Sequence, residues 1–151
     1  MEYLIEKYDT DRMLSYAPGS NEAFLTKQWL YFQVSGQGPY YGQAAWFMKY
    51  HPEQVKSALD RYMAEMKRVT ALLDGRLKKQ RETFGGEPWL VGEKMTYAGI
   101  ALIPLQLSVP KLMVEELKPD DLEQFREVAR WMERMIGRPA VKRVLELRPE
   151  Q

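Results

Sequence analysis

The residue types best suited to chemistry in this sequence gather in one stretch, VSGQGPYYGQAAWF, from Val34 to Phe47. The stretch holds three glycines and a proline, which break helices, together with two tyrosines, two glutamines and a tryptophan. A tyrosine hydroxyl or a glutamine amide at a helix break can orient a carbonyl or enol group, and aromatic faces supply an apolar wall. These residues therefore predict contacts with an apolar small molecule. The alternative is that they pack the break itself and a contact between subunits.

The predicted site has a catalytic set and a substrate-contact set. The catalytic candidates, all hydrogen-bond donors, are Tyr40, Tyr41, Gln43 and Gln106. The substrate-contact candidates are Gln37, Trp46, Tyr97, Ile100 and Ile103. The members between positions 97 and 106 recur at helical spacing, so they share one helix face, most of which we expect in the core. Gln106 is the polar exception in that apolar run.

Other catalytic centres have less support. His51, the single histidine, precedes Pro52 at a predicted helix corner, where capping or exposure explains it as well as acid–base catalysis does. The sequence has no cysteine and no ordered spacing of acids, so we predict no metal site and no cofactor. The lack of cysteine also fits a reducing, cytoplasmic setting.

Helical periodicity dominates the chain, and no run alternates with period two over more than a few residues. The clearest apolar stripe, from Val55 to Leu77, predicts a long helix over Pro52–Arg81. Further helices are predicted from Asn21 into the opening stretch, after Gly42, from Thr96 with a kink at Pro104, over Asp120–Gly137 and over Pro139–Leu147. We therefore expect one all-α domain over residues 1–151, built around a long central helix.

The charge balance excludes several classes of partner. The 22 basic and 21 acidic residues give a net charge of +1. This charge is too small to indicate binding to nucleic acid or to anionic lipid. The least polar stretch, Ala98–Val109, is too short to span a bilayer. The charged N-terminus MEYLIEKYD is not a secretory signal. The prediction is a soluble, cytoplasmic protein.

Several motifs together resemble the all-helical C-terminal domain of the glutathione S-transferase superfamily. They are FQVSGQGPYYGQAAWF, the HPE corner, WLVGEKMTYAGIALIP and IGRPAVKRVLE. The segment QVSGQGPYYGQ resembles the corresponding segment in the fungal and bacterial branch of the family, which includes the yeast nitrogen-regulator prion protein. The resemblance covers nearly the whole chain. It implies that the first long helix lines a hydrophobic substrate cleft on one side and a homodimer contact on the other.

Three departures from the family pattern affect the expected function. Residues 1–9 resemble only the last helix of the thioredoxin-like domain with which a complete transferase begins, so the glutathione site implied by the family is missing here. The family's Thr-x-x-Asp capping box keeps Thr96 but has Gly99 at the acid position, either through drift or for a functional reason. The segment LIPLQ, which ends at Gln106, stands where the branch usually has FVPWN. In relatives this helix faces the substrate cleft.

Three functions remain open from the sequence. We favour a small enzyme that acts on an apolar molecule without glutathione, by isomerisation, dehydration or ring closure in a biosynthetic pathway, because such steps need positioning and a few donors. The first alternative is a non-catalytic module for partner binding or assembly. The second is a fragment of a glutathione-conjugating transferase.

Overall fold

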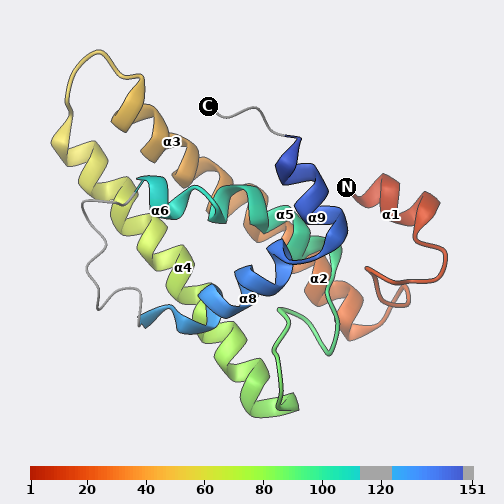
Figure 1. The fold of residues 1–151 in the computed structure, drawn as a ribbon. Helices are drawn as coiled ribbons and strands as arrows, with labels where there is room; N and C mark the ends of the chain where they lie inside the picture. Colours follow the sequence, from red (N-terminus) through yellow and green to blue (C-terminus); the bar gives the residue numbers. More distant parts are fainter. Residues whose placement is uncertain (113–123, 148–151) are drawn as a thin grey trace.

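The computed structural model describes residues 1–112 and 124–147, and within these ranges every regular element is a helix (Figure 1). The elements are α1 (Glu2–Tyr8), α2 (Asn21–Phe32), the π-helix η1 (Gln33–Gln37), α3 (Gly38–Lys49), α4 (Lys56–Phe84), α5 (Tyr97–Gln106), α6 (Val109–Leu112), α8 (Arg126–Ile136) and α9 (Pro139–Glu146). The predicted all-α class is confirmed. The first part of the helix predicted over Asp120–Gly137 lies outside the described residues, and its remainder is α8.

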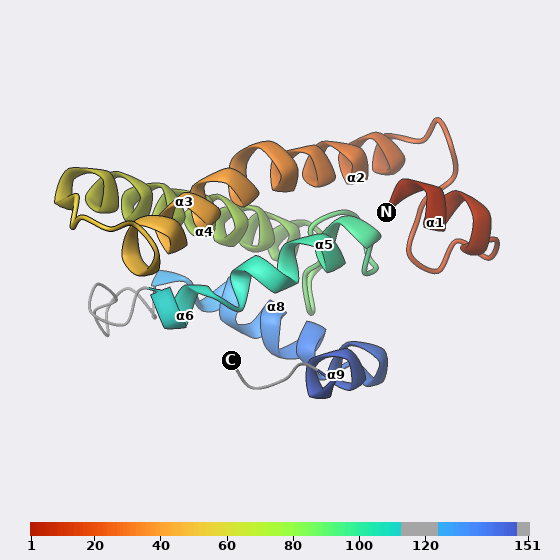
Figure 2. The ribbon, with the colours of Figure 1, turned by 90° about the horizontal axis from the view of Figure 1, so that it is seen from above.

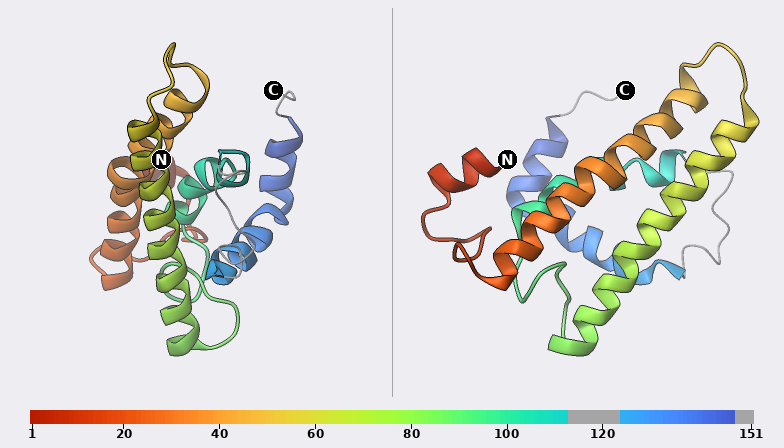
Figure 3. Two further views of the ribbon diagram at one scale, coloured as in Figure 1. Left: turned by 90° about the vertical axis from the view of Figure 1, so that its left-hand side faces the viewer. Right: turned by 180° about the vertical axis from the view of Figure 1, so that it is seen from behind.

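The helices form layers around α4. From above, α2, η1 and α3 make one continuous bent rod with α4 beside it, while α5 and α6 lie between this pair and α8 and α9 (Figure 2). From behind, the rod and α4 run side by side (Figure 3). The predicted break is thus a π-helical turn inside a continuous rod, a feature often found at functional sites.

The turn packs closely at one of its glycines. A methyl group at Gly36 would lie 3.0 Å from the Phe32 ring, so any larger residue would require that ring to shift by a few tenths of an ångström. Gly42, which the sequence placed among the residues that make the bend, instead lies within α3 with open space around it.

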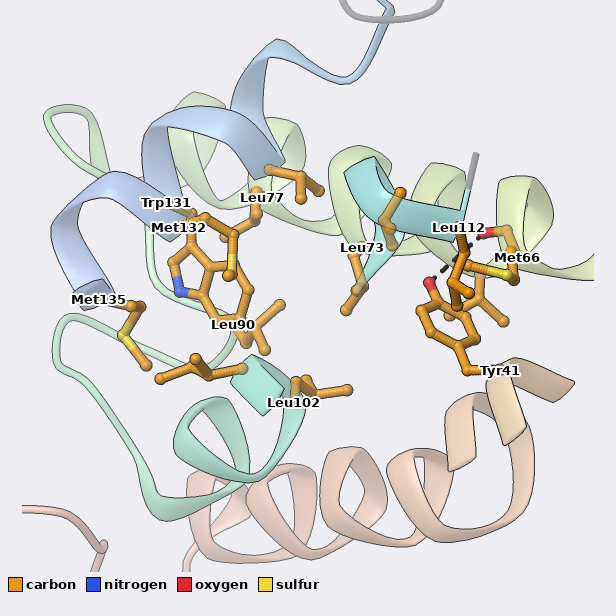
Figure 4. Close-up of a cluster of buried hydrophobic side chains, with 14 of the residues drawn as sticks. Tyr41, Met66, Leu73, Leu77, Leu90, Leu102, Leu112, Trp131, Met132 and Met135 are labelled. Atoms are coloured by element: carbon orange, nitrogen blue, oxygen red, sulfur yellow. Dashed lines mark hydrogen bonds between the residues drawn. The ribbon is translucent and has the colours of Figure 1, made fainter. Parts of the chain in front are cut away.

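The core follows the stripe that the sequence predicted on α4. Leu73 and Leu77 are fully buried there, and Trp131 and Met135 of α8 pack over the same core (Figure 4). Each buried side chain of this size contributes about 1.5–3 kcal/mol to stability, so this layer holds α8 firmly on α4.

The prediction that the long helix begins at Pro52 is wrong, because α4 begins at Lys56. The His51 Nδ1 atom accepts the Glu53 amide hydrogen at 3.1 Å, so the imidazole organises the turn that precedes the helix. The Val55 carbonyl then accepts the first helical bonds. His51 therefore has a structural role at this corner.

The incomplete capping box has a packing explanation. Thr96 makes no side-chain cap to α5. A methyl group at Gly99 would lie 3.4 Å from Met135 Cε and 3.6 Å from Trp131 Cζ2. An acid at this position would have to displace those two side chains, so glycine lets α5 approach α8 closely.

Asp9 holds the loop that joins α1 to the bundle. Its carboxylate accepts the Met13 amide at 2.8 Å, the Leu14 amide at 3.0 Å and the Ser15 hydroxyl at 2.7 Å. Burial alone would raise the pKa of Asp9, but these hydrogen bonds together hold it below its usual value. The loop therefore places α1 beside α2, and both helices contribute residues to the groove described below.

Asp74 joins α4 to α8. Its position off the apolar stripe predicts a solvated side chain, yet it is half-buried and accepts the Val128 amide at 3.0 Å in the first turn of α8. Burial raises the pKa of Asp74, and the hydrogen bond from Val128 opposes that rise. Asp74 is thus a helix cap supplied from another element, which local sequence rules cannot detect.

Replacing Asp74 with alanine should lower the free energy of unfolding by about 0.5–2 kcal/mol, as expected for a lost helix cap. Urea unfolding at neutral pH measures this change. The control is Glu82→Ala, which removes an exposed acid from the same helix and should change stability by less than about 0.5 kcal/mol. Equal effects of the two variants would contradict the capping role.

Candidate functional site

Three predicted site residues meet in a buried polar cluster on the inner side of the bend. Gln37, Tyr41 and Gln106 are 0%, 1% and 5% exposed, and Thr70 of α4, at 3%, completes the cluster. The members come from three different elements, the rod, α4 and α5. We call these four residues the buried polar cluster.

The Tyr41 hydroxyl is the centre of this cluster. It lies 3.2 Å from Gln106 Oε1 and 3.1 Å from the Thr70 hydroxyl. Gln37 Nε2 donates to Gln106 Oε1 and to the Leu102 carbonyl, both at 3.3 Å. Gln106 Nε2 in turn donates to the Thr70 hydroxyl at 3.3 Å. The cluster therefore joins the bend to α4 and α5 by hydrogen bonds in the core.

The electrostatics of the cluster make Tyr41 a hydrogen-bond donor. Burial raises the pKa of Tyr41 to about 12, although the hydrogen bond with Thr70 opposes the rise. The hydroxyl is consequently protonated at neutral pH and cannot serve as a base in this state.

The other predicted residues of the rod lie apart from the cluster. Tyr40 is half-buried, with its ring centroid 6.5 Å from that of Tyr62, and Gln43 is exposed. Trp46 is 48% exposed and stacks on Tyr50 at 6.1 Å. The structure thus separates the predicted catalytic set into a buried part and a surface part.

The predicted residues of α5 also separate. Tyr97 and Ile103 are buried, whereas Ile100 is half-buried. Only Ile100 among the nine predicted site residues lines the groove described next. The ligand-binding roles of all nine stay predictions.

An open groove of about 560 Å³ lies between the start of α1, the junction of α2 with η1, and α5. We call it the η1–α5 groove. Its apolar lining includes Leu30, Val34, Ile100, Ala101 and Pro104. Its polar lining is Glu2, Tyr31 and Gln33. An apolar concave surface with a few polar groups is the usual form of a small-molecule site.

A second cavity, of about 440 Å³, lies between α1, the loop of residues 9–19 and the start of α2. Tyr97 lines it, together with charged residues of both signs that include Arg12 and Glu6. Lys27 and Glu2, which also line it, form an ion pair at 3.6 Å. This mixed lining suits an apolar ligand less well than the η1–α5 groove does.

Sequence reasoning missed Tyr31, Gln33 and Val34, which lie one helical turn before the glycines. Tyr31 and Val34 are 58% and 62% exposed, so they place apolar surface on the outer side of the rod. The sequence did contain a signal for this surface. Tyr31 and Val34 are apolar residues on a helix face that the helical period predicts to be exposed to solvent, and exposed apolar residues that lie together can mark a binding surface.

Comparison with known proteins identifies the family. Residues 39–139 match the model of the glutathione S-transferase C-terminal domain. The chain belongs to the glutathione S-transferase family. The predicted family is confirmed. Tyr41, Thr70 and Gln106 of the buried polar cluster lie within the matched residues, whereas Gln37 and the groove residues of α1, α2 and η1 precede them.

Individual relatives agree with this assignment. Glutathione S-transferase-like protein gedE of Aspergillus terreus is 49% identical over 146 residues, which cover 96% of this chain and 64% of gedE. Glutathione S-transferase-like protein tpcF of Aspergillus fumigatus is 46% identical over 147 residues, 95% of this chain and 64% of tpcF. The chain spans about 64% of the length of these two curated relatives.

A solved structure shows the same arrangement of helices. Glutathione transferase URE2P6 from Phanerochaete chrysosporium, in complex with oxidised glutathione, matches with a TM-score of 0.84 and 45% identity. The match covers 96% of this chain and 62% of that chain. The overall arrangement of the helices is therefore similar to that of this solved structure.

Two further properties of the described residues bear on partners. None of their helices is long and apolar enough to cross a membrane. Among residues 1–112 and 124–147, no three histidine or acidic side chains gather as a candidate metal site. The cytoplasmic location stays a prediction.

Replacing Tyr41 with phenylalanine should lower the free energy of unfolding at pH 7 by about 1–3 kcal/mol, because its buried partners lose their hydrogen bond. The folded-state pKa of about 12 lies above the unfolded value of about 10. The stabilisation is thus complete below pH about 10 and is lost as the pH rises toward about 12. The difference between wild type and variant should shrink over that range.

Urea unfolding of both proteins from pH 7 to pH 12 measures this difference. The other tyrosines titrate in both proteins, so the comparison isolates Tyr41. A difference that stays constant with pH would show that the hydroxyl is not in a desolvated cluster.

Proposed function

We propose that this glutathione S-transferase-like chain binds an apolar small molecule in the η1–α5 groove and that this binding does not need glutathione. The observation that carries the proposal is the groove itself, about 560 Å³ with an apolar lining from two elements. Val34 on the rod and Ile100 on α5 both line it. A groove of this volume has room for a ligand with two fused rings.

The groove also offers polar groups to a reacting molecule. The Tyr31 hydroxyl and the Gln33 amide can donate hydrogen bonds to a carbonyl or enol, which is what isomerisation, dehydration or ring closure requires. We therefore propose these reaction classes for a catalytic role. Tyr41 and Gln106 support the wall from inside the core in this proposal.

Glutathione takes no part in the proposed binding of the apolar molecule. URE2P6, which was solved with oxidised glutathione, extends well beyond the matched region. Conjugation to glutathione is accordingly the alternative if the chain acts together with such a region.

A charge placed in the groove should weaken binding of an apolar probe. Val34→Glu should raise the Kd for 1-methylnaphthalene at least about tenfold, because the carboxylate must lose water when the probe binds. Val144→Glu is the matched control, since Val144 on α9 has the same exposure of 62% as Val34 and lies outside the groove. Equilibrium dialysis measures both. Equal Kd values for the two variants, or no binding to wild type, would overturn the proposal.

Self-association is a second candidate, supported by a surface aromatic pair. Trp46 and Tyr50 stack on one another near the end of α3 and are 48% and 68% exposed. Aromatic side chains that remain exposed together mark protein contact surfaces, and a homodimer through the rod would cover them.

Sedimentation velocity over a range of concentrations tests this second candidate. We expect a reversible dimer whose Kd rises about tenfold in Trp46→Lys. Leu147→Lys, at the exposed end of α9, is the control and should leave the Kd unchanged. A wild-type chain that stays monomeric throughout would contradict the dimer.

A further inference from the structure

We infer that the η1–α5 groove selects an apolar molecule that carries a hydroxyl group, an alcohol or a phenol. This inference rests on the proposed function, because it concerns the ligand of the same groove. The feature that carries it is a proline in the groove wall. Pro104 lies inside α5 and lines the groove.

The proline leaves a backbone acceptor without its helical donor. A helical carbonyl accepts the amide hydrogen of the residue four positions later, and proline has none. The Ile100 carbonyl therefore lacks the bond that residue 104 would supply. The proline ring also crowds this carbonyl, and such crowding tilts a helical carbonyl away from the helix axis.

The freed oxygen lies on the groove side of α5. Residues four apart share one face of a helix, and both Ile100 and Pro104 line the groove. Because a helical carbonyl points along the axis toward the later residue, the Ile100 oxygen lies between these two lining residues. It is an acceptor set in apolar surface.

A neutral hydroxyl is the donor that fits this acceptor. An apolar ligand without a donor would cover the Ile100 carbonyl and leave it unpaired, which is unfavourable. A cationic donor would be drawn to a free carboxylate, but the Glu2 carboxylate in this groove is already paired with Lys27 at 3.6 Å. The ligand class is thus an apolar alcohol or phenol.

A pair of probes and one substitution test the inference. 1-Naphthol carries the hydroxyl, and 1-methylnaphthalene has a methyl group of similar size in its place. Pro104→Ala restores an amide hydrogen at position 104, so the Ile100 carbonyl regains its helical bond. The ratio of the Kd for 1-methylnaphthalene to the Kd for 1-naphthol should fall about three- to tenfold in this variant.

Equilibrium dialysis gives both constants, and Pro139→Ala is the matched control. That proline opens α9, where the missing amide hydrogen has no helical partner to lose, so the ratio should equal that of wild type. An unchanged ratio in Pro104→Ala, with both probes bound, would overturn the hydroxyl preference and leave the proposed function standing. If neither probe binds to the wild-type chain, both the hydroxyl preference and the proposed function are contradicted.

A measurement on the wild-type chain keeps the test independent of how the variant folds. The ¹³C resonance of the Ile100 carbonyl should move farther when 1-naphthol is added than when 1-methylnaphthalene is added, because both rings occupy the groove but only the hydroxyl donates a hydrogen bond to this oxygen. The same movement with both probes would refute a hydrogen bond to this oxygen.

Discussion

The buried polar cluster of Gln37, Tyr41, Thr70 and Gln106 is the constraint on which the rest of the structure depends. Each member has its polar atoms in the core, where an unpaired donor or acceptor costs about 1–3 kcal/mol. All of these side-chain atoms are hydrogen-bonded except Gln37 Oε1. Because the partners lie on the rod, α4 and α5, these elements can pack only where the hydrogen bonds close. Apolar packing alone would tolerate small sliding of helices, and the cluster removes that freedom.

The groove follows from the same constraint. Gln106 and Pro104 lie two residues apart on α5, one in the buried polar cluster and the other in the groove wall. The π-helical turn likewise places Gln37 in the core and Gln33 and Val34 in the groove. Two elements therefore carry both the support and the binding surface. A wall held in this way is preorganised, which favours selective binding of a rigid apolar molecule.

The sequence predicted the helices well and the site only in part, for physical reasons. An apolar stripe such as that ending at Leu73 and Leu77 reports helix and core together, so the long central helix could be recognised. A π-helical turn adds residues to one turn, so the helical period no longer shows which side chains beyond Gln33 face inward. Tyr41 is buried and its neighbour Tyr40 is half-buried, a difference that the sequence pattern did not predict. Contacts between distant elements, such as Asp74 with Val128, leave no local pattern at all.

The central claim is that an apolar molecule binds the η1–α5 groove without glutathione. The most direct test is methyl NMR of the chain titrated with 1-methylnaphthalene, first alone and then with glutathione added. The account predicts that the methyl resonances of Leu30, Val34 and Ile100 shift together in the first titration and that glutathione leaves these shifts unchanged. Shifts confined to methyl groups outside the groove, or shifts that appear only once glutathione is present, would contradict it.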